Sequence, residues 1–237
     1  VRKEVPQAIR DCISAGINIK IVTGDTTGTA KEIGRQVGLW TSEDGDKNII
    51  TGPEFAAMND SEAKELLRDL NFKIISRARP DDKARLVTLL QSIGEVVAVT
   101  GDGTNDAPAL KRADVGFAMG SGTDVCKEAG DIIITDDNFV SIADAVLFGR
   151  TFLHNVIKFL SFQMPINIVL VILSLVYPIM FVVPAFVAVQ ILIINICEDS
   201  LNSLAFGGEP AKAEYMNTPP QPKGASLFAG KTLDKIV

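Results

Sequence analysis

The chain has 237 residues, enough for one large domain or two ordinary ones with a buried core. Its 23 Lys and Arg against 29 Asp and Glu give a net charge of −6, which disfavours nucleic acid as a partner, and its 47% apolar content excludes a disordered chain. The 39 residues from Phe159 to Cys197 carry no charge, and this run excludes a wholly soluble protein because one membrane span needs about 20 apolar residues.

Composition divides the chain into residues 1–150, which are typical of a soluble α/β domain, a membrane-like part at 151–207, and a connecting loop at 208–237. In the first part, short β-branched runs alternate with helical patterns, which predicts a doubly wound parallel sheet. The predicted strands are 18–22, 72–75, 96–100, 115–118 and 132–135, and the predicted helices are 28–37, 61–70, 82–92, 108–113 and 123–129. Ligand sites of such sheets lie beyond the carboxyl ends of the strands.

The membrane-like part predicts two spanning helices. Ser141 is a suitable N-cap without a later stop signal, so one long helix is expected to run from the α/β domain into the bilayer. The first span is expected at 156–176 and the second at 185–205, with an uncharged turn between Pro178 and Pro184. Lys and Arg flank the outer ends of this pair and are absent from the turn, which predicts that the α/β domain and both chain ends are cytoplasmic.

Two predicted strands end in Gly-rich acidic loops, at residues 23–25 and 100–108. A Thr hydroxyl and free amides at a helix N-terminus bind phosphate oxygens, and carboxylates beside an amide, as in Asp102, Asn105 and Asp106, suit Mg²⁺. Either loop alone is equally well explained as a capped turn. The two together on parallel strands predict a phosphate and magnesium site.

Lys83 lies between these loops in the sequence. Pro80 and Asp81 indicate a helix start, which places Lys83 in the first helical turn near the same edge of the sheet. A lysine there can pair with a carboxylate and neutralise phosphoryl charge. Taken alone, a solvated surface lysine explains the residue better.

Three segments together resemble the phosphorylation domain of P-type ATPases, which belong to the haloacid-dehalogenase-like superfamily. They are Thr-Gly-Asp at 23–25, the helix with Pro80 and Lys83, and Thr-Gly-Asp-Gly-Thr-Asn-Asp-Ala-Pro-Ala-Leu at 100–110. The resemblance continues into the membrane pair, where residues 159–163 and 209–210 are most similar to calcium pumps of the plasma-membrane type. It implies a haloacid-dehalogenase-like doubly wound parallel sheet followed by an α-helical transmembrane hairpin, with residues 1–150 as the C-terminal part of the phosphorylation domain.

The family's reaction is attack by an aspartate on the γ-phosphoryl of ATP with Mg²⁺ bound, followed by hydrolysis of the aspartyl phosphate. By resemblance, the residues that contact nucleotide or phosphate are Thr23, Gly24, Asp25, Arg77, Lys83 and Asn105, the catalytic residues are Lys83 and Asp106, and the magnesium ligands are Asp102 and Asp106.

The family's nucleophile stands in an Asp-Lys-Thr-Gly-Thr loop, which this sequence does not contain. The chain is therefore expected to be a fragment whose nucleophilic aspartate lies outside it and whose partner is the missing remainder of the same pump polypeptide. Alone, it is expected not to hydrolyse ATP.

Polar residues interrupt the predicted spans. Asn167 lies in the first span, and Asn195, Glu198 and Asp199 share one face of the second at spacings i, i+3 and i+4. Because an ionisable group at mid-membrane costs about 2.5–3.5 kcal/mol, these residues predict ligands for a dehydrated cation. Alternatively, Glu198 and Asp199 mark a helix end at the interface.

In the family's calcium pumps, an Asn in the first span and an Asn and an Asp in the second bind the ion, and Asn167, Asn195 and Asp199 match them. Leu170 stands where two-site pumps have Glu, which favours one ion per cycle. Glu198 departs from the pattern as either a ligand or a carrier of a counter-transported proton.

The sequence thus predicts a segment of an ATP-driven calcium-transporting P-type ATPase, a multi-pass protein of the plasma membrane. Its expected cofactor is Mg²⁺, and its expected partners are ATP, Ca²⁺ and membrane lipid. Three alternatives remain: a pump for another cation, an inert regulatory or truncated pump segment, and a membrane-anchored phosphatase. The phosphatase needs a nucleophilic Asp upstream of Thr23, and none can be placed there.

Overall fold

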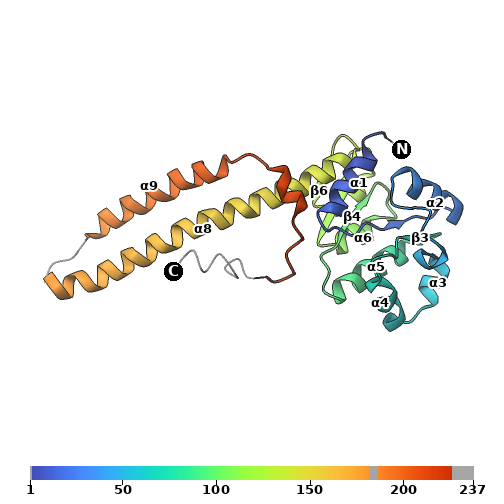
Figure 1. The fold of residues 1–237 in the computed structure, drawn as a ribbon, viewed down its shortest axis with the longest axis horizontal. Coiled ribbons are helices and arrows are strands. Elements are labelled where there is room, and N and C mark those ends of the chain that lie inside the picture. Colours follow the sequence, from blue (N-terminus) through green and yellow to red (C-terminus); the bar gives the residue numbers. More distant parts are fainter. Residues whose placement is uncertain (1, 182–185, 226–237) are drawn as a thin grey trace. The chain divides into compact units, whose positions relative to one another are not determined.

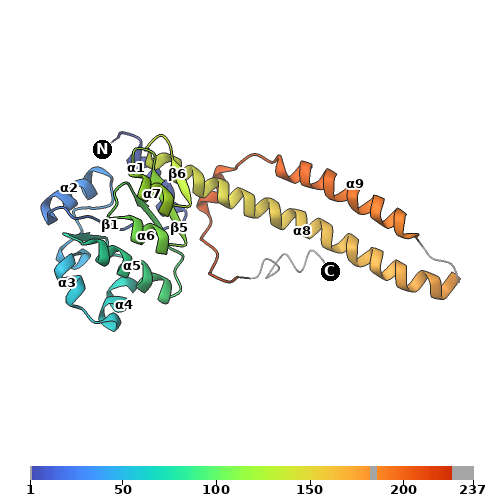
Figure 2. The same ribbon diagram turned by 180° about the vertical axis from the view of Figure 1, so that it is seen from behind.

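The computed structural model describes residues 2–181 and 186–225, which fall into two compact units. Residues 2–146 and 216–223 form an α/β unit, and residues 147–215 form a helical unit. Figures 1 and 2 show their labelled helices and strands from opposite sides.

The strands of the α/β unit form two parallel three-stranded sheets. The first has the order β1-β3-β2, with β1 at Ile21–Val22, β2 at Ile49–Thr51 and β3 at Ile74–Ser76. The second has the order β4-β5-β6, with β4 at Ala98–Gly101, β5 at Val115–Met119 and β6 at Ile132–Ile134. The prediction of a parallel α/β fold is confirmed, and its strands divide into two sheets in which β1 and β4 are each edge strands. The sequence analysis missed β2, which is only three residues long.

Helices separate successive strands, as the alternating pattern predicts. They are α1 at Val5–Ser14, α2 at Thr27–Gln36, α3 at Gly52–Ala57, α4 at Asp60–Arg68, α5 at Pro80–Ser92, α6 at Ala107–Arg112 and α7 at Asp124–Ala129, with a 3₁₀ turn η1 at Asp46–Asn48. The five predicted helices are confirmed within a few residues, but α1 and α3 were missed. In α1, Ala8 and Cys12 recur at helical spacing and are buried. In α3, Thr51 and Glu54 form a capping box.

A cluster of large apolar side chains forms the main core of the first sheet. Phe55, Phe72 and Ile75 are almost completely buried, and Leu86 and Leu89 of α5 pack against them. Fully burying one such side chain stabilises the fold by about 1.5–3 kcal/mol. This packing fixes α5 against β3 and therefore fixes the position of the first turn of α5.

Lys20 precedes β1 and gives the α/β unit a pH-dependent stability. Burial lowers the pKa of Lys20 from 10.5 to about 8, although Asp69 and Glu95 oppose the shift, and its Nζ donates to the Phe72 carbonyl at 2.6 Å. Between pH 8 and 10.5, the unfolded chain holds more protons than the folded chain, so the free energy of unfolding should rise with pH in this range. Denaturant titrations of Lys20→Met should show a smaller rise. Equal slopes for variant and parent would contradict this origin.

The helical unit contains the C-terminal part of α8 (Phe139–Phe181) and α9 (Ala188–Gly207), both long and apolar enough to cross a membrane. With 43 residues, α8 is about 65 Å long, twice the bilayer core, which confirms one helix continuing from the α/β unit. The predicted start at Ser141 was wrong, because α8 begins at Phe139 and the Ser141 hydroxyl donates to the Asp136 carboxylate.

The predicted turn after Pro178 was also wrong in its start. Pro178 lies inside α8, which continues to Phe181, and Pro165 lies inside it as well. A proline removes one helical hydrogen bond, whereas ending a helix in hydrocarbon leaves several backbone groups unpaired. Residues 182–185, which include the rest of that turn and Pro184, lie outside the described residues.

Candidate functional site

The loop after β1 is held by the loop after β3. The Ala78 N–H donates to the Thr23 carbonyl and the Arg77 N–H to the Asp25 carbonyl, each at 2.9 Å. The Thr23 hydroxyl accepts from the Asp25 N–H at 3.1 Å, and Gly24 packs near the Ala78 carbonyl. The structure therefore brings the predicted phosphate-binding residues 23–25 next to the predicted nucleotide contact Arg77.

The segment from Arg77 to α5 has a constrained backbone. Arg77 has φ of +50°, a conformation that is uncommon for a residue other than glycine. The buried Asp82 carboxylate then accepts from the Arg79 N–H at 2.8 Å and caps α5, which begins at Pro80. These contacts set the direction in which the first turn of α5 presents Lys83.

Lys83 joins the first sheet to the loop that follows β4. Its Nζ lies 2.6 Å from Asp106 Oδ1, and the two side chains are only 22% and 12% exposed. The other Asp106 oxygen faces the backbone N–H groups of Asp102 and Gly103 at 3.4 and 3.3 Å. Lys83 of α5 therefore contacts the end of the loop that connects β4 to α6.

The first turn of helix α7 holds the backbone of the loop that follows β4. The Thr123 N–H donates to the Asp102 carbonyl at 2.9 Å, and the Cys126 thiol donates to the Gly101 carbonyl at 3.2 Å. Burial raises the pKa of Cys126, and the nearby carboxylates of Asp106 and Asp102 raise it further, so this thiol stays protonated. A neutral Cys126 thiol next to the loop adds no negative charge beside the carboxylates of Asp102 and Asp106.

The donor set at this edge suits Mg²⁺. Magnesium usually binds one or two carboxylates and completes its shell with waters and substrate phosphates. Asp102 and Asp106 supply two carboxylates, and no cluster of three or more His, Cys, Asp or Glu suited to a metal occurs within residues 2–181 and 186–225. Asp102 and Asn105 are exposed, whereas Asp106 is buried against Lys83. Asp102 is therefore the carboxylate open to a direct metal bond.

Gly101 leaves room for Asp106. A Cβ atom at Gly101 would lie 2.4 Å from Asp106 Cβ, so Gly101→Ala must displace the carboxylate from Lys83. We expect a loss of about 1–3 kcal/mol in the free energy of unfolding, measured by denaturant titration. Gly103→Ala in the same loop is the control, because its Cβ would meet Asp106 Oδ2 at an ordinary 3.6 Å. Equal losses in both variants would contradict the steric explanation.

The predicted cation ligands lie on α8 and α9. Asn167 and Asn195 line one groove of about 290 Å³, together with Leu170, Ser174 and Ile191. The structure therefore places Asn167 of the first predicted span and Asn195 of the second in the same groove.

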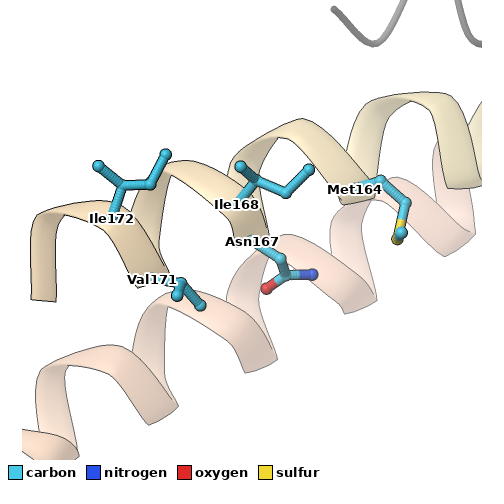
Figure 3. A pocket seen from close by; sticks show the side chains of 5 residues that line it. All are labelled: Met164, Asn167, Ile168, Val171 and Ile172. Carbon is cyan, nitrogen blue, oxygen red and sulfur yellow. The ribbon is translucent and has the colours of Figure 1, made fainter. Parts of the chain in front are cut away.

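Figure 3 shows Asn167 directed away from Ile168 and Ile172 of the same helix. A second groove of about 250 Å³ there is lined by Met164, Val171 and these three residues. Asn167 is its only side chain with a polar amide, so the rest of this surface of α8 suits hydrocarbon.

The other two predicted ligands lie on the same side of α9. Asn195 Oδ1 and Glu198 Oε1 are buried without a hydrogen-bond partner, and Asp199 Oδ1 accepts a hydrogen bond from the Gln163 side chain of α8. The sequence analysis missed Gln163, although it precedes Asn167 by one helical turn, a signal that could have found it.

Comparison with known proteins gives matches along the whole chain. The family described as haloacid dehalogenase-like hydrolase matches residues 1–114, another with the same description matches residues 84–146, and the family described as cation transporting ATPase, C-terminus, matches residues 183–237. The fold and these matches are similar to those of one class of protein, the P-type cation-transporting ATPases.

Its relatives within that class are calcium pumps. The chain is 46% identical to calcium-transporting ATPase 2 of Schizosaccharomyces pombe over 96% of its own length and 18% of the relative's. It is 44% identical to a probable calcium-transporting ATPase 9, plasma membrane-type, of Oryza sativa subsp. japonica, over 96% of this chain and 22% of the relative. It is 40% identical to the endoplasmic reticulum calcium ATPase srcA of Aspergillus fumigatus, over 97% of this chain and 24% of the relative. The chain therefore spans between 18% and 24% of the length of these relatives.

Proposed function

We propose that this chain is the part of an ATP-driven calcium pump that joins the phosphorylation site to the ion path. The observation that supports the proposal is the contact between Lys83 of α5, the helix that follows β3 of the first sheet, and Asp106 in the loop that follows β4 of the second sheet. Phosphoryl transfer needs positioning and charge neutralisation more than covalent chemistry from the protein, and this contact offers both.

The proposed roles of the α/β residues follow from their positions. The Thr23 hydroxyl and Gly24 hold phosphoryl oxygens, and Arg77 beside this loop contacts the nucleotide. Asp25 and Asn105 complete the phosphate and nucleotide contacts. Phosphate oxygens suit such Gly-rich loops because glycine lets the backbone approach the ligand closely.

Lys83 and Asp106 act on the charge of the reaction. Lys83 donates to the phosphoryl group as negative charge develops, and its contact with Asp106 directs the ammonium group to the edge. Asp102 binds Mg²⁺ directly, with Asp106 beside it. When bound, Mg²⁺ supplies neutralisation of the charge on the transferred phosphoryl group.

The nucleophilic aspartate is proposed to come from polypeptide outside this chain. Strands β1 and β4 are edge strands, and such strands present backbone N–H and C=O groups that can pair with another strand. A strand that ends in the nucleophile and pairs with either edge would deliver its aspartate to the carboxyl edge, where residues 23–25 and Asp102 lie.

The proposed cargo is Ca²⁺, bound by Asn167, Asn195, Asp199 and Glu198. Amide and carboxylate oxygens are the ligands that Ca²⁺ prefers. The proposed location is the plasma membrane, with the α/β unit and both chain ends cytoplasmic. The Lys and Arg residues that flank the spans support the proposed topology. Leu170, which stands where two-site pumps have Glu, supports the plasma-membrane type.

The test uses the full-length protein that contains this chain, in sealed vesicles. Acid-stable phosphoenzyme formed from radiolabelled ATP and Mg²⁺ is measured with Ca²⁺, Mn²⁺, Na⁺ or K⁺. We expect Ca²⁺ in the micromolar range to stimulate formation most strongly. Stimulation by another ion alone would assign that ion as cargo, and absence of any phosphoenzyme would contradict the pump itself.

A further inference from the structure

Gln163 connects the two membrane helices at the predicted cation site. It lies on α8 one turn before Asn167, and its side-chain N–H donates to Asp199 Oδ1 on α9. An amide N–H on a carboxylate is a charge-assisted hydrogen bond, which fixes the direction of the carboxylate more strongly than a neutral pair would. The orientation of Asp199 therefore depends on Gln163.

The other end of this amide is unpaired. Gln163 Oε1 is buried without a hydrogen-bond partner, as are Asn195 Oδ1 and Glu198 Oε1 on the facing helix. Unpaired polar atoms between apolar helices cost free energy because hydrocarbon offers them no partner. Three unpaired oxygens from both helices, beside one carboxylate, form the donor set of a hard cation.

Given the calcium transport proposed above, on which this inference rests, we propose that Gln163 is a positioning residue of the cation site. Its N–H holds the Asp199 carboxylate toward the space between α8 and α9, and its amide oxygen adds a neutral ligand there. A neutral oxygen raises the number of ligands without adding charge that the bilayer must accommodate.

The experiment compares variants of the full-length protein in vesicles. Gln163→Leu removes both functions of the amide, and Gln163→Glu keeps the shape but places a second carboxyl beside Asp199. Gln190→Leu on α9 is the matched control, because this exposed glutamine receives a hydrogen bond from the Val187 N–H at the helix start. The readouts are the Ca²⁺ concentration for half-maximal phosphorylation by ATP, and phosphorylation by inorganic phosphate without Ca²⁺.

For Gln163→Leu, we expect about a tenfold higher half-maximal Ca²⁺ concentration, the effect of one lost charge-assisted hydrogen bond, with unchanged phosphorylation by inorganic phosphate. For Gln163→Glu, the two carboxyls should share a proton, so that Ca²⁺ affinity rises more steeply with pH than in the parent. If Gln163 and Asp199 support only the fold and do not face the ion, the pH dependence of Ca²⁺ affinity should not change.

The outcomes separate this inference from the proposed function. A parent protein without Ca²⁺-dependent phosphorylation contradicts the proposed function. A Ca²⁺-dependent parent whose Gln163→Leu variant matches Gln190→Leu overturns the role of Gln163 alone. If Gln163→Leu loses phosphorylation by inorganic phosphate, the variant is too damaged to report on Ca²⁺ binding. The pH dependence of Ca²⁺ affinity in Gln163→Glu is then the test, and a dependence parallel to that of the parent overturns the inference.

Discussion

Replacing Lys83 by Met should lower the rate of phosphoenzyme formation from ATP at least about 100-fold, even at saturating Ca²⁺. Lys83 is the cation that the fold places against Asp106, 2.6 Å away and largely shielded from water. Met keeps much of the apolar length of the side chain but removes the charge, so phosphoryl charge would develop without its partner. The measurement is the acid-stable phosphoenzyme formed from radiolabelled ATP in rapid-quench experiments.

The same variant should also unfold more easily, because it leaves the Asp106 carboxylate buried without its cation. Breaking a buried pair typically costs about 3–5 kcal/mol, and the partial exposure of this pair places the expected loss at the lower end. Lys47→Met is the control, since Lys47 is exposed within η1. Adding Asp106→Asn to Lys83→Met should restore much of the stability but none of the activity. Unchanged phosphorylation in Lys83→Met would remove this residue from the reaction.

The sequence determines the local elements of this fold better than their assembly. Runs such as Ile132–Ile134 predict strands because β-branched side chains suit a buried sheet. Strand β2 escaped prediction because Ile49–Thr51 is short and lies directly between η1 and α3. The division into two sheets was also beyond the sequence, because the same alternation of strands and helices is compatible with one ladder or two.

The candidate site shows the same limit. The motif at residues 100–108 and the helix start at Pro80 indicate chemistry individually, but their meeting depends on how α5 packs against α6. That packing follows from core residues such as Val87 of α5, which packs with Ala109 of α6 and lies outside both motifs. Gln163 was missed for a related reason. A glutamine in an apolar helix becomes informative only when the structure shows that it donates to Asp199 on the neighbouring helix.

The polar groups between α8 and α9 differ from those at the proposed phosphate site in how well their hydrogen bonds are satisfied. Asn195, Glu198 and Gln163 each leave an oxygen unpaired, whereas Lys83 and Asp106 satisfy one another. At the proposed phosphorylation edge the charged groups thus pair with each other, whereas the unpaired membrane groups would gain partners from a bound cation. Ion binding should therefore stabilise the helical unit more than nucleotide stabilises the α/β unit.

Replacing Asp199 by Asn should raise the Ca²⁺ concentration needed for phosphorylation by ATP more than about 100-fold. The substitution keeps the shape of the side chain and an oxygen that accepts from Gln163, so it removes the charge with little change in geometry. A divalent ion in a low-dielectric site loses much of its binding free energy when a carboxylate becomes neutral. Phosphorylation by inorganic phosphate without Ca²⁺ should persist, because the α/β residues are unchanged.

Asp144→Asn, on the exposed start of α8 outside the predicted span, is the matched control and should behave like the parent. The comparison separates the charge at Asp199 from a general effect of neutralising a carboxylate on these helices. If Asp199→Asn retains the parent's Ca²⁺ dependence, Asp199 is not a ligand and the ion path lies elsewhere. If it loses phosphorylation by both ATP and inorganic phosphate, Asp199 supports the fold rather than the ion, since binding alone cannot affect the reaction that needs no Ca²⁺.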